Sequence, residues 1–141
     1  MSTVPEAALV AVLVSVVVVA AATRRRQRGL RNSAAATTDL TVDDRSVTRT
    51  LGDGRVESAR WSALESVELV RTPVKTADGA SSFLILAETA QLGCLVPLGV
   101  GLEREVLERL ATLRGFRVEK FNSALEKRPP HREFLWQRPE P

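Results

Sequence analysis

The hydrophobic and polar positions follow three successive patterns along the chain. Residues 7–23, AALVAVLVSVVVVAAAT, are 17 positions without a charge, followed by a basic stretch and then by alternating and helical patterns. As a helix this run extends about 25 Å, at about 1.5 Å per residue, and the hydrocarbon core of a bilayer is about 30 Å thick. We therefore predict an N-terminal transmembrane helix over residues 1–23, in which residues 5–23 contact the lipid bilayer.

A cluster of arginines follows the apolar run directly and marks the membrane interface: Arg24, Arg25, Arg26, Arg28 and Arg31. Positive charge next to a span stays on the cytoplasmic side. This predicts a single-pass protein of the inner cell membrane, with its N-terminus outside and the following residues in the cytoplasm. Residues 24–38 form the basic juxtamembrane linker. The cluster sets topology, and attraction to anionic lipid is a second, compatible role.

Two other interpretations of the apolar run are possible, a cleaved signal peptide and a buried core helix. A cleaved signal peptide needs positive charge before the run, whereas MSTVPE carries only Glu6 and the α-amino group. A buried core helix is the second alternative, but this run is apolar on every side and stands next to five arginines. Both interpretations are less favoured than a membrane span.

From Asp39 the pattern changes to a period of two, which is typical of half-buried strands. Turn-forming residues, most clearly Gly52-Asp53-Gly54, separate the alternating segments. Trp61 and Leu64 are placed on one side of a one-turn corner. The pattern predicts a meander of about six short antiparallel strands, at residues 39–42, 46–51, 55–61, 65–72, 83–87 and 91–98.

A helical period replaces the alternation after residue 101. Leu102, Val106, Leu110 and Leu113 fall on one stripe, which predicts an amphipathic helix over residues 102–113 that ends at Gly115. A second short helix is predicted over residues 118–127, and the apolar residues 134–136 should pack back on the domain. The predicted fold class is α+β. After the transmembrane helix comes a small pleckstrin-homology-like antiparallel barrel or sheet, capped by a C-terminal amphipathic helix.

The net charge of +3 belongs to the juxtamembrane stretch. Five of the 20 basic residues lie within residues 24–31, and 16 of the 17 acidic residues come after it, so the remaining domain is close to neutral. A basic surface is the footprint of nucleic-acid binding, and therefore we predict no nucleic-acid partner.

Few residues suit catalysis or ligand binding. The one His, His131, lies in a proline-rich segment and is expected to be a solvated loop residue; the one Cys, Cys94, lies in an apolar strand. A zinc site needs about four Cys or His ligands. Asp43, Asp44 and Asp53 lack the calcium-loop spacing and are expected to be turn acids. We predict no catalytic residue, cofactor, metal ligand or small-molecule substrate.

Four sequence blocks, in this order, resemble a known family: VTRTLGDGRVESARWSALESVELV, GCLVPLG, LERLATLRGF and FLWQR. The family consists of small uncharacterised actinobacterial proteins with pleckstrin-homology-like domains, some of which carry one N-terminal membrane helix. The resemblance covers nearly all of residues 39–138. It implies a cytoplasmic domain of that fold over these residues and implies no activity.

Three functions remain open on this basis. The first is a non-enzymatic, membrane-anchored cytoplasmic module that binds a protein partner or acts as a scaffold at the inner face. The second is a domain that senses anionic lipid, which would need a basic loop, whereas the predicted loops are acidic or neutral. The third and least favoured is a small enzyme.

Replacing Arg24, Arg25, Arg26 and Arg28 by neutral residues should scramble the membrane orientation, because the charge asymmetry across the span is lost. Cysteine labelling from either side of the membrane measures the orientation. Neutralising four arginines beyond residue 100 is the control and should leave it unchanged. A uniform wild-type topology in the first variant would refute the assignment.

Overall fold

A computed structural model of the chain describes residues 35–140. The predicted transmembrane helix over residues 1–23 and the five arginines at the membrane interface lie outside these residues. Within residues 35–140, neither helix is long and apolar enough to cross a membrane. The predicted combination of antiparallel strands with a few helices is confirmed for this part of the chain.

Sheet A contains the first three strands, β1 (Thr37–Val42), β2 (Ser46–Leu51) and β3 (Val56–Arg60), in the order β1-β2-β3. The predicted turns connect them. Gly54 has a φ of 91°, a conformation that glycine adopts without steric cost, and its N–H donates to the Leu51 carbonyl. The first strand begins at Thr37, two residues before the predicted domain boundary at Asp39.

Sheet B contains β4 (Ser66–Arg71), β5 (Ser82–Ala87), β6 (Gly93–Pro97) and β7 (His131–Gln137), in the order β6-β5-β4-β7. The last strand corrects the prediction, which treated residues 134–136 only as a packing patch. Residues 131–137 pair antiparallel with β4 along its whole length. The described residues therefore contain seven strands instead of about six.

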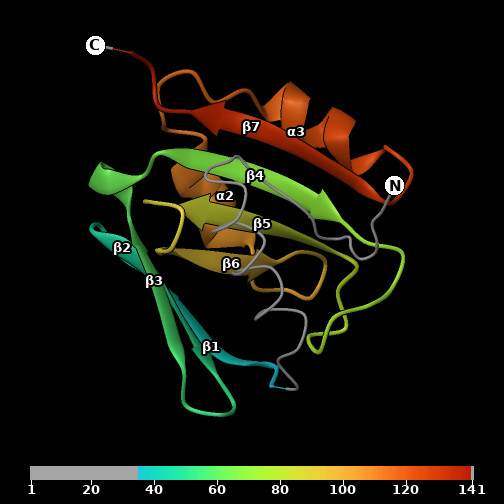
Figure 1. Cartoon of the computed structure of the whole chain (residues 1–141). Helices are drawn as coiled ribbons and strands as arrows, with labels where there is room; N and C mark the ends of the chain where they lie inside the picture. The colour runs from blue at the N-terminus through green and yellow to red at the C-terminus, as the bar shows by residue number, and fades with distance from the viewer. Residues whose placement is uncertain (1–34, 141) are drawn as a thin grey trace.

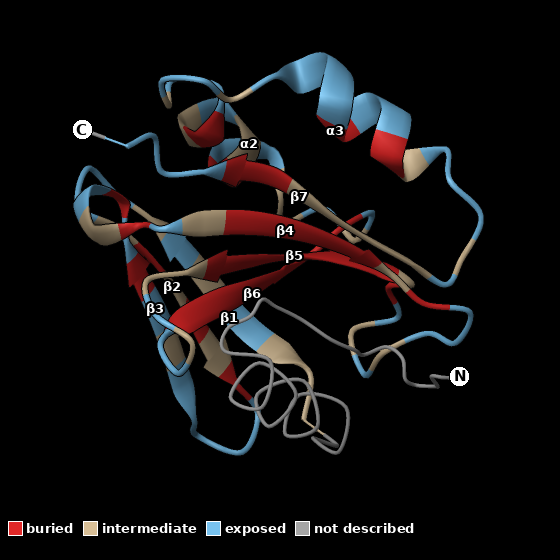
Figure 2. Ribbon diagram, turned by 45° about the horizontal axis from the view of Figure 1, so that its top comes forward, coloured by how far each residue is buried: buried red, intermediate tan, exposed pale blue. Residues whose placement is uncertain are grey.

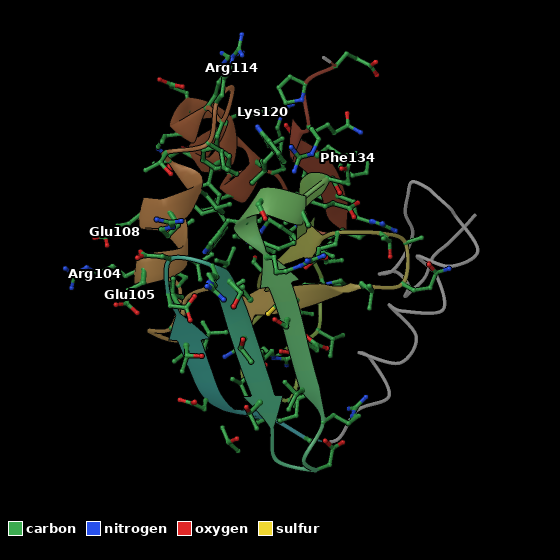
Figure 3. All side chains as sticks on the ribbon, turned by 90° about the vertical axis from the view of Figure 1, so that its left-hand side faces the viewer. Arg104, Glu105, Glu108, Arg114, Lys120 and Phe134 are labelled. Atoms are coloured by element: carbon green, nitrogen blue, oxygen red, sulfur yellow. The ribbon has the colours of Figure 1, made fainter. Side chains whose placement is uncertain are left out.

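The helices follow β6 and are shorter than predicted. They are α2 (Arg104–Leu110) and α3 (Val118–Leu125), and a 3₁₀ turn, η1 (Trp61–Ala63), forms the expected corner between β3 and β4. The predicted end of α2 at Gly115 is wrong, because the helix gives way to turns after Leu110. The charged side chains Arg104, Glu105 and Glu108 point outward from α2 (Figure 3).

The strands of residues 35–140 do not close into a barrel, which settles the predicted alternative of barrel or sheet. Figure 1 shows the strands of sheet A running steeply across those of sheet B. Strands β3 and β6 meet where the sheets join, but a side chain replaces strand pairing there: the Glu57 carboxylate accepts the Leu95 N–H at 2.9 Å. The Glu57 carboxylate therefore provides a hydrogen-bond acceptor for the backbone at the edge of β6, and β3 does not pair with β6 as a further strand of sheet B.

The main core lies between the two sheets and the two helices. The inner face of sheet B is formed by alternate residues of β4, β5 and β6, which are Val67, Leu69, Leu84, Leu86, Cys94 and Val96. Sheet A contributes Val47 and Ala59 to the same core, and the helices contribute Val106, Leu110, Phe121 and Ala124. Figure 2 shows β4, β5 and β6 buried along most of their length. Burial on both sides, as predicted for residues 83–87, is confirmed.

Trp61 fixes the corner between the sheets. It is 8% exposed, its indole N–H donates to the Asp43 carbonyl at 3.0 Å, and the Arg109 guanidinium lies 5.4 Å from its ring centroid. A cation over an indole face is an attractive contact. The indole therefore connects α2, the β1–β2 turn and the end of β3, and Trp61 belongs to the main core.

The Trp61→Ala variant should lower the free energy of unfolding by about 3–5 kcal/mol, because it leaves a cavity in the core. Urea denaturation measures this loss. Val56→Ala, at a position that is 61% exposed, is the control and should change stability by less than about 0.5 kcal/mol. Equal midpoints for the two variants would contradict the assignment of Trp61 to the core.

Candidate functional site

The candidate residues named from the sequence are not brought together. The five arginines Arg24, Arg25, Arg26, Arg28 and Arg31 lie outside the described residues. Cys94 is fully buried on the inner face of sheet B, as expected. His131 is not the predicted loop residue: it begins β7, and its ring lies 2.8 Å from a carboxylate oxygen of Glu133. Strand pairing with Arg71 places it there.

The turn acids behave as predicted. Asp43 accepts the N–H groups of Ser46 and Arg45, and these bonds hold the pKa of its carboxyl below the ordinary value. Asp53 accepts the Arg55 N–H, with the same effect on its pKa. Within residues 35–140, no group of three or more His, Cys, Asp or Glu side chains could hold a metal ion.

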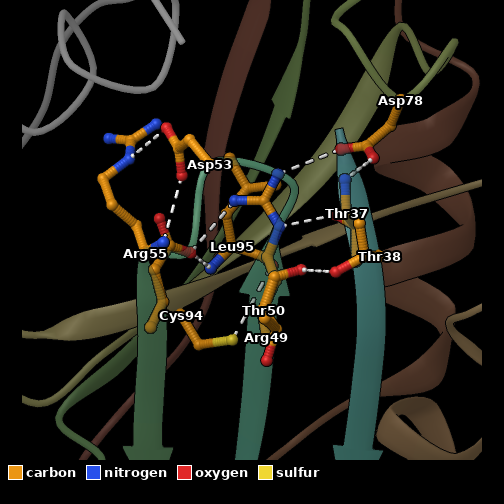
Figure 4. Close-up of polar contacts among 10 residues, drawn as sticks. Thr37, Thr38, Arg49, Thr50, Asp53, Arg55, Asp78, Cys94 and Leu95 are labelled. Atoms are coloured by element: carbon orange, nitrogen blue, oxygen red, sulfur yellow. Dashed lines mark hydrogen bonds and ion pairs between the residues drawn. The ribbon is translucent and has the colours of Figure 1, made fainter. Parts of the chain in front are cut away.

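Arg49 is the centre of a buried polar cluster between β1, β2, β3 and the connection from β4 to β5 (Figure 4). Its side chain is only 5% exposed and binds three partners. The guanidinium lies 3.1 Å from a Glu57 oxygen and 3.0 Å from an Asp78 oxygen, and it donates to the Thr37 hydroxyl at 2.7 Å. A buried charge is tolerated when it is paired and hydrogen-bonded in this way.

The partners of Arg49 extend the network to the rest of the domain. Glu57 also binds the Leu95 N–H on β6, and Asp78, in the connection between β4 and β5, accepts the Thr37 N–H at 2.6 Å. We call Thr37, Arg49, Glu57 and Asp78 the junction cluster. The junction cluster connects sheet A to sheet B. It also holds Thr37, the first residue of β1, in place.

The sequence carries a signal for this cluster, which was not among the predictions. Arg49 alternates with Val47 and Leu51, so the period of two places it on the buried face of β2. A charge on an apolar face requires a buried partner. The partner itself is not visible in the sequence, because Asp78 is 29 residues away.

A second buried ion pair joins β4 and β7. The guanidinium of Arg132 binds Glu68 through two bonds of 2.9 and 3.1 Å, and the side chains are 16% and 8% exposed, respectively. Burial raises the pKa of the Glu68 carboxyl, and the charge and hydrogen bonds of Arg132 oppose this shift. Glu68 alternates with the inner-face residues Val67 and Leu69, so the pair lies on the opposite face of sheet B.

That opposite face also carries apolar side chains. We define the outer face of sheet B by Val70, Phe83, Ile85 and Leu95, which form a cluster separate from the main core. Their side chains project from β4, β5 and β6 between the inner-face residues of the same strands. The described domain thus combines two buried arginine–carboxylate clusters with an apolar sheet face.

Comparisons with protein-family models, with curated proteins and with solved structures find no match to this chain. The chemistry of the described clusters must therefore be judged from their geometry. Arg does not lose its proton in proteins, so Arg49 and Arg132 hold carboxylates in place and do not transfer protons. Within the described residues, both arginines therefore position carboxylates inside the fold.

Arg49→Met should lower the free energy of unfolding by about 3–5 kcal/mol, because it leaves Glu57 and Asp78 buried without their cation. Thermal and urea denaturation measure this effect. Arg104→Met is the matched control: its ion pair with Glu108 is exposed, at 87% and 63%, so its removal should cost less than about 0.5 kcal/mol. A small loss for both variants would mean that the junction cluster contributes little to stability.

Proposed function

We propose that this chain is a single-pass, membrane-anchored, non-enzymatic module whose cytoplasmic domain binds a protein partner at the inner membrane face. The observation that supports the proposal is that hydrogen bonds hold Ala36 and Thr37, at the start of the described residues, firmly against the domain. Next to Thr37 in the junction cluster, the Ala36 carbonyl accepts the Gly52 N–H at 2.9 Å. The connection between a membrane span and the domain would therefore end at a rigid point.

A short linker keeps such a domain close to the bilayer. Residues 24–36 extend at most about 45 Å, at up to about 3.5 Å per residue. A tether of this length raises the effective concentration of the domain near any partner in the same membrane. A weak protein contact is then enough for function.

The arrangement of strands supports a pleckstrin-homology-like domain of the kind that the family resemblance implies. An antiparallel meander comes first, the two sheets cross, and the helices follow. The sheet order leaves β1 at one edge of sheet A and β7 at one edge of sheet B. Edge strands offer backbone N–H and C=O groups to an extended segment of a partner. We assign partner binding to these edges.

Site-specific photo-crosslinking in intact cells tests this proposal. A photoreactive residue at Thr41 on β1 or at Gln137 on β7, both exposed, should give a discrete protein adduct in the membrane fraction. The same residue at exposed Arg104 on α2 is the control and should not. The proposal fails if neither edge gives an adduct above the control. Phospholipid adducts from the loop at residues 52–55 would favour lipid sensing instead.

A further inference from the structure

The charges of the described domain are unevenly distributed along the chain. Residues 35–110 contain 8 basic and 12 acidic residues, whereas residues 111–140 contain 7 basic and 4 acidic residues. The segment that includes α3 and β7 therefore carries an excess of three positive charges, although the domain as a whole is close to neutral. An asymmetry of this kind indicates a surface that attracts an anionic partner.

Ion pairs within the domain neutralise only two of these seven basic residues. Arg132 is paired with Glu68, and Arg138 is paired with Glu65. The other five are exposed and have no carboxylate partner among residues 35–140. We call these five residues the basic surface: Arg114, Arg117, Lys120, Lys127 and Arg128.

The basic surface is built around α3. Two of its members precede the helix, Lys120 lies in the first turn, and two follow the last helical residue. Ser123 lies three residues after Lys120 and four before Lys127, so the three side chains share one flank of the helix. Phe121 and Ala124 on the opposite side are buried in the main core and hold α3 in place.

The figures place this surface at one end of the domain. Figure 3 shows Arg114 and Lys120 at the same end, far from the β2–β3 turn. Figure 1 likewise shows α3 and the β2–β3 turn at opposite ends of the domain. A flat anionic surface that binds α3 therefore leaves the β2–β3 turn pointing away from it.

The exposed part of α3 favours lipid headgroups over a protein as the anionic partner. A protein interface depends on a few apolar or aromatic anchors at its centre. Val118 is the exposed apolar residue of α3, and it lies two positions before Lys120, on the other flank. Anionic headgroups, in contrast, attract Lys and Arg through charge alone.

We infer that the basic surface binds the anionic headgroups of the bilayer and thereby orients the domain. The β2–β3 turn, with its exposed Asp53, then points away from the lipid. The edge of β1 in sheet A stays open to a partner in the cytoplasm. This cytoplasmic orientation rests on the proposed function, whereas the lipid contact is measured separately.

Fluorescence quenching in the full chain tests the inference. The chain is synthesised in a cell-free system with vesicles of phosphatidylcholine, either alone or mixed with phosphatidylglycerol. A fluorophore on Ser123→Cys reports on the basic flank of α3, and the wild-type chain, whose one cysteine is fully buried, is the blank. A quencher on the lipid headgroups should act about threefold more strongly when phosphatidylglycerol is present, because basic residues are drawn to an anionic surface.

Neutralising the basic surface should remove this effect. The combined variant Arg114→Gln, Arg117→Gln and Lys120→Gln loses three positive charges without a change in the buried face of α3. Quenching of the Ser123→Cys probe should then be the same with and without phosphatidylglycerol. High salt should act in the same direction on the unmodified surface, because it screens exposed charges.

Two controls separate the basic surface from the charge of the whole domain. The combined variant Arg45→Gln, Lys75→Gln and Arg104→Gln also loses three exposed positive charges, but it should keep the phosphatidylglycerol effect. A probe on Val56→Cys, which is 61% exposed close to the β2–β3 turn, should be quenched weakly with both kinds of vesicle.

The outcomes distinguish this inference from the membrane anchor. Equal quenching of Ser123→Cys in both kinds of vesicle, in chains that float with them, would overturn the lipid contact and leave the anchor intact. A phosphatidylglycerol effect that survives neutralisation of the basic surface, or that is as strong at Val56→Cys, would also overturn the inference. Chains that float only with phosphatidylglycerol, and lose this flotation in the neutralised variant, would contradict the anchor and support the basic surface.

A protein as the occupant of the basic surface is an outcome of a second measurement. A photoreactive residue at Ser123 in intact cells should give phospholipid adducts. Discrete protein adducts at this position, without phospholipid adducts, would assign the surface to an acidic protein and overturn the inference.

Discussion

Sheet B buries apolar side chains on both of its faces, and this constraint governs the rest of the domain. Its inner face requires the layer that sheet A, α2 and α3 provide. Trp61 and Arg109 hold this layer at the corner between the sheets, and the junction cluster holds it where β3 meets β6. Its outer face carries a separate apolar cluster of Val70, Phe83, Ile85 and Leu95.

Local features of the fold could be predicted because they depend on neighbouring residues. Gly52-Asp53-Gly54 specified a hairpin turn, since glycine supplies the positive φ. The apolar run at residues 83–87 specified a strand buried on both faces, and Pro97 specified its partner's end. Trp61 and Leu64 were placed on one side of a corner, and both are buried there. In each case the residues that determine the local structure lie within a few positions of one another in the sequence.

Features that depend on distant residues were missed. Strand β7 forms because β4, about 60 residues earlier, offers a free edge, and HREFLWQ alone does not distinguish a strand from a packing patch. The gap between the sheets depends on Glu57 accepting the Leu95 N–H, a contact between strands 38 residues apart. Arg49 lies on an apolar face, but Asp78 becomes its partner only when the chain folds. The same holds for Arg132 and Glu68.

The membrane anchor that we propose depends on residues 7–23, an uncharged apolar run that a bilayer would surround. Alkaline extraction of membranes that contain the full chain is the most direct test of this account. The account predicts that the chain stays in the pelleted bilayer after the wash. Its recovery as a full-length, soluble chain would contradict the membrane anchor on which the account depends.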